Sequence, residues 1–300
     1  MESPSHDANQ TAEQPNRCNA DVETRVPLGL SPEQLLSGLA HLNQEWGGHP
    51  DRLKYFEAIH RVALQGMGIG LAESEATELR ALSYAAERIA SRGKCEQPVV
   101  FDVGANVGKY TALALSVFAN PRLFCFEPSH TAFSVLQQRF GSPERGSISM
   151  HRLALSDSHG QACLHANHAG SGLASLYKRD LRFAGIPFEF SEPVKATTLD
   201  IFCDVFNIDK IQYLKLDVEG AELSVLSGAR RLLQSRRIEF IQFEFGGTDI
   251  DSRTFFRDFW NILQGYNIYR MMSKGLGLIE SYHEGREIFG YQNYFAELRN

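Results

Sequence analysis

Short, almost continuously apolar runs that alternate with helical segments constrain this chain most. Five such runs, VVFDVG, RLFCFE, SISMHRLAL, IQYLKLD and IEFIQFEF, alternate with segments of helical periodicity such as 109–118, 129–140 and 221–235. Strands that are apolar on both faces and joined by crossover helices are typical of a parallel sheet covered by helices on both sides. We therefore predict an α/β fold. The C-terminal segments YNIYRMM and NYFAEL suit two further strands, one of them antiparallel.

The part of the chain before these runs has a different character. Residues 1–30 are polar and show neither helical nor strand periodicity, which predicts a flexible tail. A capping box at Ser31 and Gln34 then opens a series of apolar stripes at helical spacing. We predict a helical N-terminal segment over 31–97, followed by the main domain over 98–300. These helices either pad one edge of that domain or form a lid or dimerisation element, so a homodimer is compatible with the sequence.

Charge and composition limit the partners. The formal net charge is -6 and the pI is about 5.9, whereas nucleic-acid binding needs clustered Lys and Arg, so we expect no nucleic-acid partner. The sequence has neither the charged and apolar pattern of a signal peptide nor an apolar run long enough to cross a bilayer. We therefore expect a cytoplasmic protein with no membrane partner. The 5 scattered cysteines, without C-x-x-C spacing, favour a reducing compartment.

Polar residues and glycines follow the first three runs, where a doubly wound sheet binds its ligands. The first run leads into Gly104, Asn106 and Gly108, a G-x-N-x-G loop that can approach a ligand closely at a helix N-terminus. Glu127 ends the second run, nineteen residues after Gly108, where an acid accepts hydrogen bonds from ribose hydroxyls. Asp157 follows the third run and either accepts from an adenine amino group or caps a turn. Together these strand ends predict an adenosine-binding pocket.

The segments FDVGANVGKYT, FCFEPS, LALSD, YLKLDVEGAELSVLSGA and NYFA resemble, in order and spacing, the FkbM family of methyltransferases over roughly residues 98–298. The resemblance implies a class I methyltransferase fold, a Rossmann-like seven-stranded sheet with helices on both faces. It also implies S-adenosylmethionine as the methyl donor and, as acceptor, a hydroxyl of a sugar, a glycan or a glycosylated natural product. By position, the resemblance maps cofactor binding to Asp102, Gly104, Asn106, Gly108, Glu127 and Asp157.

The fourth and fifth runs carry the candidates for chemistry. Lys215 and Asp217 alternate onto one side of the fourth run, Glu219 follows at the turn, and Glu244 lies near the end of the fifth run. Such buried charges are costly unless they pair or serve a site. We expect these four residues to be catalytic, with Asp217 and Glu244 also candidate ligands for a divalent cation such as Mg²⁺. Alternatively, the two glutamates anchor helix N-termini.

Other bases and other functions stay open. His165 and His168 lie in a polar, glycine-containing insert and are alternative general bases, although loop histidines are commonly only solvated. An NAD-dependent oxidoreductase shares the glycine turn and the ribose acid, but the G-x-N-x-G spacing and the two late strands favour a methyltransferase. A non-catalytic S-adenosylmethionine-binding protein is the third interpretation. The sequence does not identify the methyl acceptor.

Overall fold

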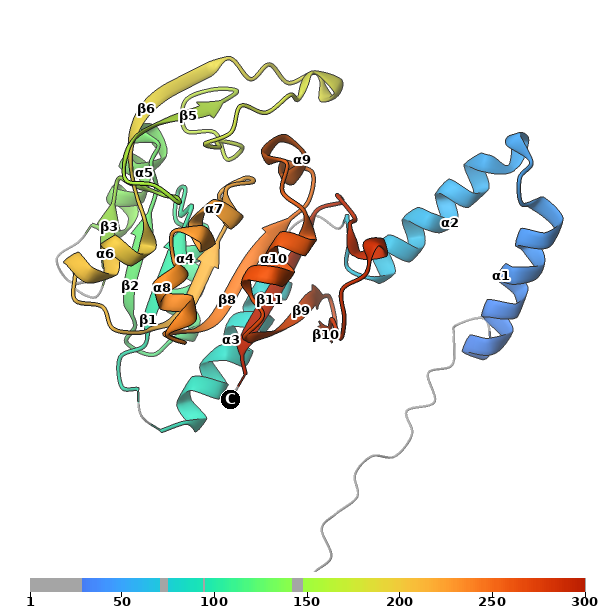
Figure 1. Cartoon of the computed structure of the whole chain (residues 1–300), viewed down its shortest axis with the longest axis horizontal. Helices are drawn as coiled ribbons and strands as arrows, with labels where there is room; N and C mark the ends of the chain where they lie inside the picture. The colour runs from blue at the N-terminus through green and yellow to red at the C-terminus, as the bar shows by residue number, and fades with distance from the viewer. Residues whose placement is uncertain (1–28, 71–74, 94, 142–147, 300) are drawn as a thin grey trace, which may run out of the picture. The chain divides into compact units, whose positions relative to one another are not determined.

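The structure, a computed structural model, describes residues 29–70, 75–93, 95–141 and 148–299. The chain divides into two compact units, Met1–His60 and Arg61–Asn300 (Figure 1). Nearly all of the predicted tail lies outside the described residues.

The first unit is helical, as predicted. Its described elements are α1 (Pro32–Trp46), the 3₁₀ turn η1 (Pro50–Arg52) and the first part of α2 (Leu53–Gly66). The capping box is confirmed: the Ser31 hydroxyl accepts from the Gln34 N–H at 3.2 Å, and the Gln34 side chain accepts from the Ser31 N–H at 2.7 Å. In α1, η1 and α2 no residue is buried, so these helices contribute little to the described core.

The second unit is built on one mixed sheet of eight strands in the order β10-β9-β11-β8-β7-β1-β2-β3. The neighbouring strands β8, β7, β1, β2 and β3 run parallel to one another. Strand β11 is antiparallel to both of its neighbours, and β10 is antiparallel to β9. The strands are β1 (Val99–Val103), β2 (Arg122–Phe126), β3 (Ile148–His151), β7 (Ile211–Leu216), β8 (Ile238–Phe245), β9 (Tyr266–Met272), β10 (Gly275–Leu278) and β11 (Gln292–Leu298). This arrangement confirms the α/β class I fold that the family resemblance implies.

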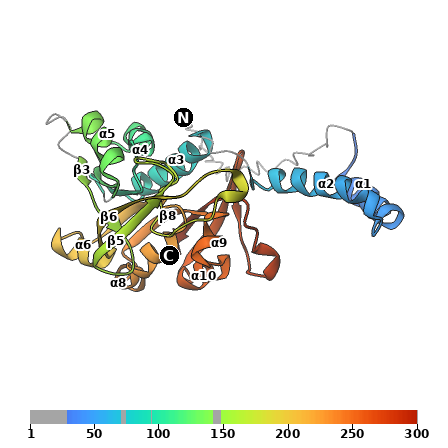
Figure 2. The same ribbon diagram turned by 90° about the horizontal axis from the view of Figure 1, so that it is seen from above.

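Helices cover both faces of this sheet (Figure 2). One face carries α3 (Glu75–Ser91), α4 (Lys109–Val117) and α5 (His130–Phe140), and the other carries α6 (Leu199–Val205), α7 (Glu222–Ser227), α8 (Arg230–Gln234) and α10 (Phe256–Ile262). A short helix, α9 (Thr248–Ser252), follows β8. A separate hydrophobic cluster fills each interface, which explains why β1, β7 and β8 are buried along their whole length.

Three details differ from the sequence expectation. The run SISMHRLAL is not one strand: it forms β3 and then β4 (Ala154–Leu155), which joins a second sheet with β5 (Gly160–Ala166) and β6 (Phe190–Thr197). The helical pattern over 221–235 is divided into α7 and α8, which are separated by Gly228 and Ala229. A Cβ at Gly228 would lie 2.0 Å from the Ser156 carbonyl oxygen, so this position requires glycine. The turn-rich segment near the C-terminus adds β10 as an eighth strand.

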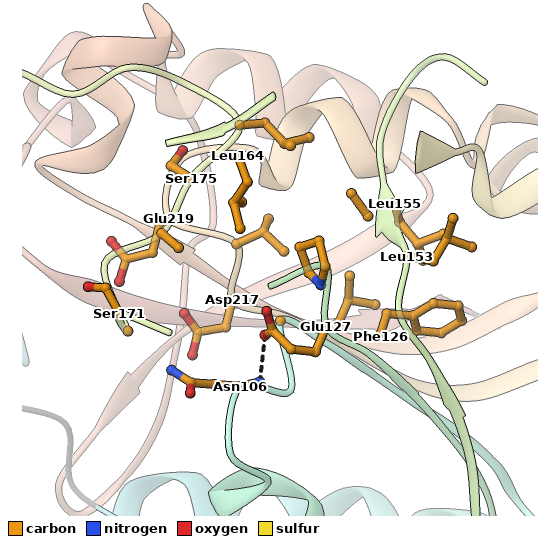
Figure 3. A pocket seen from close by; sticks show the side chains of 18 residues that line it. Asn106, Phe126, Glu127, Leu153, Leu155, Leu164, Ser171, Ser175, Asp217 and Glu219 are labelled. Atoms are coloured by element: carbon orange, nitrogen blue, oxygen red, sulfur yellow. Dashed lines mark hydrogen bonds between the residues drawn. The ribbon is translucent and has the colours of Figure 1, made fainter. Parts of the chain in front are cut away.

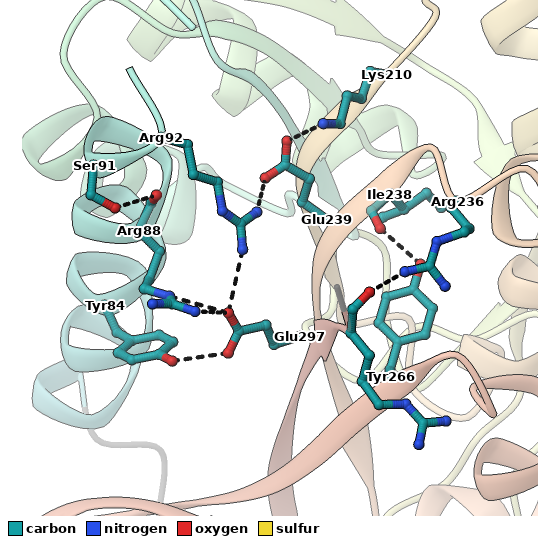
Figure 4. Close-up of polar contacts among 11 residues, drawn as sticks. Tyr84, Arg88, Ser91, Arg92, Lys210, Arg236, Ile238, Glu239, Tyr266 and Glu297 are labelled. Atoms are coloured by element: carbon teal, nitrogen blue, oxygen red, sulfur yellow. Dashed lines mark hydrogen bonds and ion pairs between the residues drawn. The ribbon is translucent and has the colours of Figure 1, made fainter. Parts of the chain in front are cut away.

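Helix α3 is fixed to the sheet by ion pairs as well as by its apolar face (Figure 4). Its buried residues are Ala81, Leu82, Ala85 and Ile89. Glu297 on β11 accepts hydrogen bonds from Tyr84 at 2.9 Å and from Arg88 at 3.0 Å. Arg92, one turn further along, pairs with Glu239 on β8 at 2.6 Å.

Among the described helices, none is both long and apolar enough to span a membrane.

Candidate active site

The carboxyl ends of β1, β2 and β7 enclose a pocket where the strand order of the sheet reverses (Figure 3). It contains about 520 Å³ of empty space and is partly open to solvent. Its lining combines an apolar wall with carboxylates and hydroxyls: Val103, Gly104, Asn106, Phe126, Glu127, Pro128, Leu153, Ala154, Leu155, Leu164, Ser171, Gly172, Ala174, Ser175, Leu176, Asp217, Val218 and Glu219. The pocket therefore suits a ligand with one flat apolar part and several polar groups.

Glu127 is the central acid of this pocket. Its side chain is buried, and its two carboxylate oxygens accept the N–H groups of Asn106 and Ser129, each at 2.8 Å. Burial raises the pKa of Glu127 to about 7, although the two N–H groups oppose that shift. Each oxygen retains a further lone pair, so the carboxylate can still accept from a ligand hydroxyl.

The loop after β1 depends on Gly104. This residue has a φ of +85°, and a Cβ there would lie 1.8 Å from the carbonyl oxygen of Asp217 at the end of β7. Only glycine allows the two neighbouring strand ends to approach so closely. The next loop residue to line the pocket, Asn106, also has a positive φ, +47°.

Three of the residues mapped to cofactor binding lie outside the pocket lining. Asp102 is buried against α4, where it accepts a hydrogen bond from the Thr111 hydroxyl at 2.6 Å. A Cβ on Gly108 would lie 2.4 Å from the Phe140 ring, so this glycine permits α5 to pack closely. Asp157 is exposed, and its backbone N–H donates to a serine hydroxyl on α7. A role for these three residues in binding stays a prediction.

Lys215 and Asp217 form an ion pair at the end of β7. The Lys215 side chain is 2% exposed, and its Nζ donates to Asp217 Oδ2 at 2.8 Å. Burial favours the neutral amine, but the charges of Asp217 and Glu78 outweigh it and raise the pKa of Lys215. A charged lysine therefore orients Asp217, whose side chain points into the pocket (Figure 3).

Glu219 also lines the pocket and is held from another direction. Its backbone has a φ of +55°, an uncommon conformation for a residue with a side chain. Arg179, from the segment between β5 and β6, donates to Glu219 at 2.6 Å and has its own side chain only 9% exposed. The structure thus joins the insert to the turn after β7 through a nearly buried ion pair.

Glu244 is buried on β8 and is not part of the pocket lining. Burial raises its pKa well above the usual range, and the negative charges of Asp217, Glu219 and Glu222 add to the effect. A catalytic role for Glu244 therefore stays a prediction.

Glu222 and Asp249 were not among the predicted site residues. Glu222 is fully buried and accepts the N–H groups of Val218 and Gly220, at 2.8 and 2.9 Å, so it fixes the turn that carries Glu219. Asp249 accepts from the Gly246 N–H at 2.8 Å. Burial raises the pKa of Glu222 to about 7 and that of Asp249 to about 8. The acidic EGAE sequence was the available signal for Glu222, and nothing in the local pattern marked Asp249.

No three His, Cys, Asp or Glu side chains in the described part of the chain are arranged to hold a metal ion. Asp217 and Glu244 therefore do not form a metal site here with a third such ligand, and the Mg²⁺ hypothesis stays a prediction. The alternative bases lie elsewhere. His165 is in β5, His168 bonds the Ala169 carbonyl oxygen, and neither lines the pocket.

The donor and acceptor groups of the pocket fit S-adenosylmethionine. Leu155 and Leu164 offer an apolar surface for a purine, Glu127 offers acceptors for a ribose diol, and Asp217 and Glu219 supply negative charge for a sulfonium. The absence of a side chain at Gly104 leaves room for the contact between neighbouring strands that closes the pocket floor.

A mixed sheet of this order with such a pocket at its switch point defines a class I S-adenosylmethionine-dependent methyltransferase. The model of the family described as "Methyltransferase FkbM domain" matches residues 102–270, more than half of the chain. The chain therefore belongs to the FkbM methyltransferase family, as its motifs indicated.

Similar proteins include two curated methyltransferases. 2-O-methyltransferase NoeI of Sinorhizobium fredii is 24% identical over 189 residues, which cover 60% of this chain and 76% of NoeI. Hexuronic acid methyltransferase AglP of Haloferax volcanii is 28% identical over 151 residues, which cover 50% of this chain and only 58% of AglP. A crystal structure of a methyltransferase FkbM from Methylobacillus flagellatus aligns with a TM-score of 0.42 and 17% identity, over 83% of this chain and 60% of that protein.

Proposed function

We propose that this protein transfers a methyl group from S-adenosylmethionine to a hydroxyl oxygen of a sugar, a glycan or a glycosylated small molecule. The observation that carries the proposal is the pair formed by Lys215 and Asp217. It places an oriented carboxylate in the same pocket as the candidate ribose acid, Glu127. The relatives NoeI, a 2-O-methyltransferase, and AglP, a hexuronic acid methyltransferase, support this choice of acceptor.

In this proposal, Glu127 holds the ribose, Gly104 and Asn106 supply the loop beside it, and the leucines of the apolar wall enclose the adenine. S-adenosylmethionine supplies an already activated methyl group. The protein has two tasks left, to align an acceptor lone pair with that methyl and to accept the proton of the hydroxyl. Alignment can contribute about 7 to 11 kcal/mol to lowering the barrier.

Asp217 is the proposed proton acceptor. Its carboxylate reaches the pocket, whereas Glu244 lies outside the pocket lining and has a raised pKa that favours its protonated form. Lys215 occupies one carboxylate oxygen of Asp217 and leaves the other for the acceptor hydroxyl. A well-placed general base contributes about 100- to 10,000-fold in rate.

The acceptor is proposed to approach along a groove in the insert. Residues 178–182 and 185–189 line this groove, and Arg179, one of them, bonds Glu219 of the cofactor pocket. A ligand in the groove would therefore reach the pocket at this ion pair. The groove carries both cationic and anionic side chains, which suits a neutral, hydroxyl-rich molecule better than a strongly charged one.

The test is a methylation assay with mono- and oligosaccharide acceptors, followed by mass spectrometry and location of the new methyl group. We expect S-adenosylhomocysteine to form together with an O-methyl product, and Asp217→Asn to lower kcat about 100-fold. Methylation at nitrogen or carbon, or undiminished turnover by Asp217→Asn, would contradict the proposal. Turnover after EDTA treatment, with and without added Mg²⁺, decides the separate question of metal dependence.

A further inference from the structure

Glu78, on α3, lies behind the ion pair of the active site. One oxygen of its carboxylate is 3.9 Å from Nζ of Lys215, which itself bonds Asp217 at 2.8 Å. The Glu78 side chain is 17% exposed and Lys215 only 2%. Glu78 precedes residues 102–270, which match the family model, so neither that match nor the motifs of the family include it.

A buried polar network fixes the position of Glu78. The side-chain oxygen of Gln242 accepts from the hydroxyls of Tyr110 at 2.8 Å and Tyr213 at 2.7 Å. This orients the amide nitrogen of Gln242 toward Glu78, to which it donates at 3.4 Å. The ammonium of Lys215 also lies 4.9 Å from the centre of the Tyr110 ring. Side chains from α3, α4, β7 and β8 therefore meet at one lysine.

We propose that Glu78 is a positioning residue of the methyl-transfer site, whose carboxylate shares the charge of Lys215 with Asp217 and so makes the electrostatic potential in the cofactor pocket more negative. This inference rests on the proposed cofactor pocket and not on the identity of the acceptor.

Glu78 adds a second carboxylate to the pair of Lys215 and Asp217, so its ionised side chain makes the electrostatic potential at the pocket more negative than the pair alone does. The Lys215 side chain is almost fully buried, so little solvent screens its interaction with the two carboxylates. A more negative potential in the pocket favours the positive sulfonium of S-adenosylmethionine over the uncharged thioether of S-adenosylhomocysteine. The ratio of the two dissociation constants therefore reports the charge that Glu78 supplies.

The experiment compares Glu78→Gln with the wild-type chain by calorimetric titration of both ligands. We expect the affinity for S-adenosylmethionine to fall by about fivefold relative to that for S-adenosylhomocysteine. Glu78→Asp, which keeps the charge, should restore most of the wild-type ratio. If Glu78→Gln is too unstable to study, Glu78→Ala removes the same charge with a smaller side chain.

Arg88→Gln is the matched control. Arg88 also joins α3 to the sheet, through Glu297, but does not line the cofactor pocket. A loss of α3 docking alone should weaken both ligands by the same factor and leave the ratio unchanged. An unchanged ratio in folded Glu78→Gln would overturn the role of Glu78, whereas failure of the wild-type chain to bind S-adenosylmethionine would overturn the proposed pocket itself.

Discussion

Asp249 shows how individual buried acids shape the stability of this site. Burial is the main cause of its raised pKa, and the neighbouring charge of Glu222 adds to it. One carboxylate oxygen of Asp249 is buried without a hydrogen-bond partner in the structure. An ionised carboxylate in that position is destabilising, so the free energy of unfolding should depend on its protonation.

The pH dependence has a definite sign. The folded-state pKa of Asp249, about 8, lies above the unfolded value of 3.8, so the folded state binds the proton more tightly. Stability is therefore highest below the unfolded pKa and is lost as the pH rises from about 4 to about 8. Asp249→Asn removes this dependence. We expect its melting temperature, relative to the wild-type chain, to increase steadily over that range by several degrees. A constant difference at every pH would show that Asp249 does not titrate.

Glu127 allows a second prediction for a single residue. Glu127→Gln keeps the size of the side chain, but an amide can no longer offer two anionic oxygens to N–H groups and ribose hydroxyls. We expect the dissociation constant of S-adenosylmethionine to rise about 10- to 100-fold, which corresponds to about 1.5 to 3 kcal/mol. Calorimetric titration measures it. Glu96→Gln, at an exposed acid outside the pocket lining, is the control and should bind like the wild-type chain.

Among the elements, the turn between β1 and α4 has the strictest backbone requirement. Gly104 and Gly185 both have positive φ, +85° and +70°, so an alanine at either position carries similar backbone strain. The two positions differ in the room available for a side chain. A Cβ at Gly104 would clash with the Asp217 carbonyl oxygen, whereas a Cβ at Gly185 would have no atom within 4 Å. The turn therefore couples the two strands that form the pocket floor.

This difference predicts the effect of alanine at each position. Gly185→Ala should cost about 1 kcal/mol of unfolding free energy from strain alone. Gly104→Ala should cost about 3 kcal/mol or more, because β1 and β7 must separate, and should also weaken S-adenosylmethionine binding. Urea denaturation compares the two variants. Equal losses would mean that the contact with Asp217 is easily relieved.

For the whole molecule, the sequence was sufficient for the sheet but not for everything that surrounds its pocket. The parallel core was predictable because its strands are apolar on both faces, and Glu127 and Asp217 were predictable because they end such strands. The second sheet was missed, since β4 is only 2 residues long and partly exposed strands such as β6 lack a clear apolar alternation. Arg179 and Glu78 could not be assigned from local patterns, because each acts on a residue far away in the sequence.

The N-terminal helices give the last prediction, which separates their roles by truncation. In α1, η1 and α2 no residue is buried, whereas α3 buries four. Arg88 of α3 pairs with Glu297, and Arg92, just after the helix, pairs with Glu239. A chain that starts at residue 61 should therefore keep its fold and its affinity for S-adenosylmethionine.

A chain that starts at residue 95 should behave differently. Loss of α3 exposes the apolar surface of the sheet that Ala81, Leu82 and Ala85 cover, and it leaves the buried acids of β8 and β11 without those partners. We expect this chain to aggregate or to melt at a much lower temperature. Soluble yield, thermal unfolding and ligand titration of the two truncated chains make the comparison. If both chains fold and bind S-adenosylmethionine with the same affinity, the sheet does not require α3, and the site does not require Glu78.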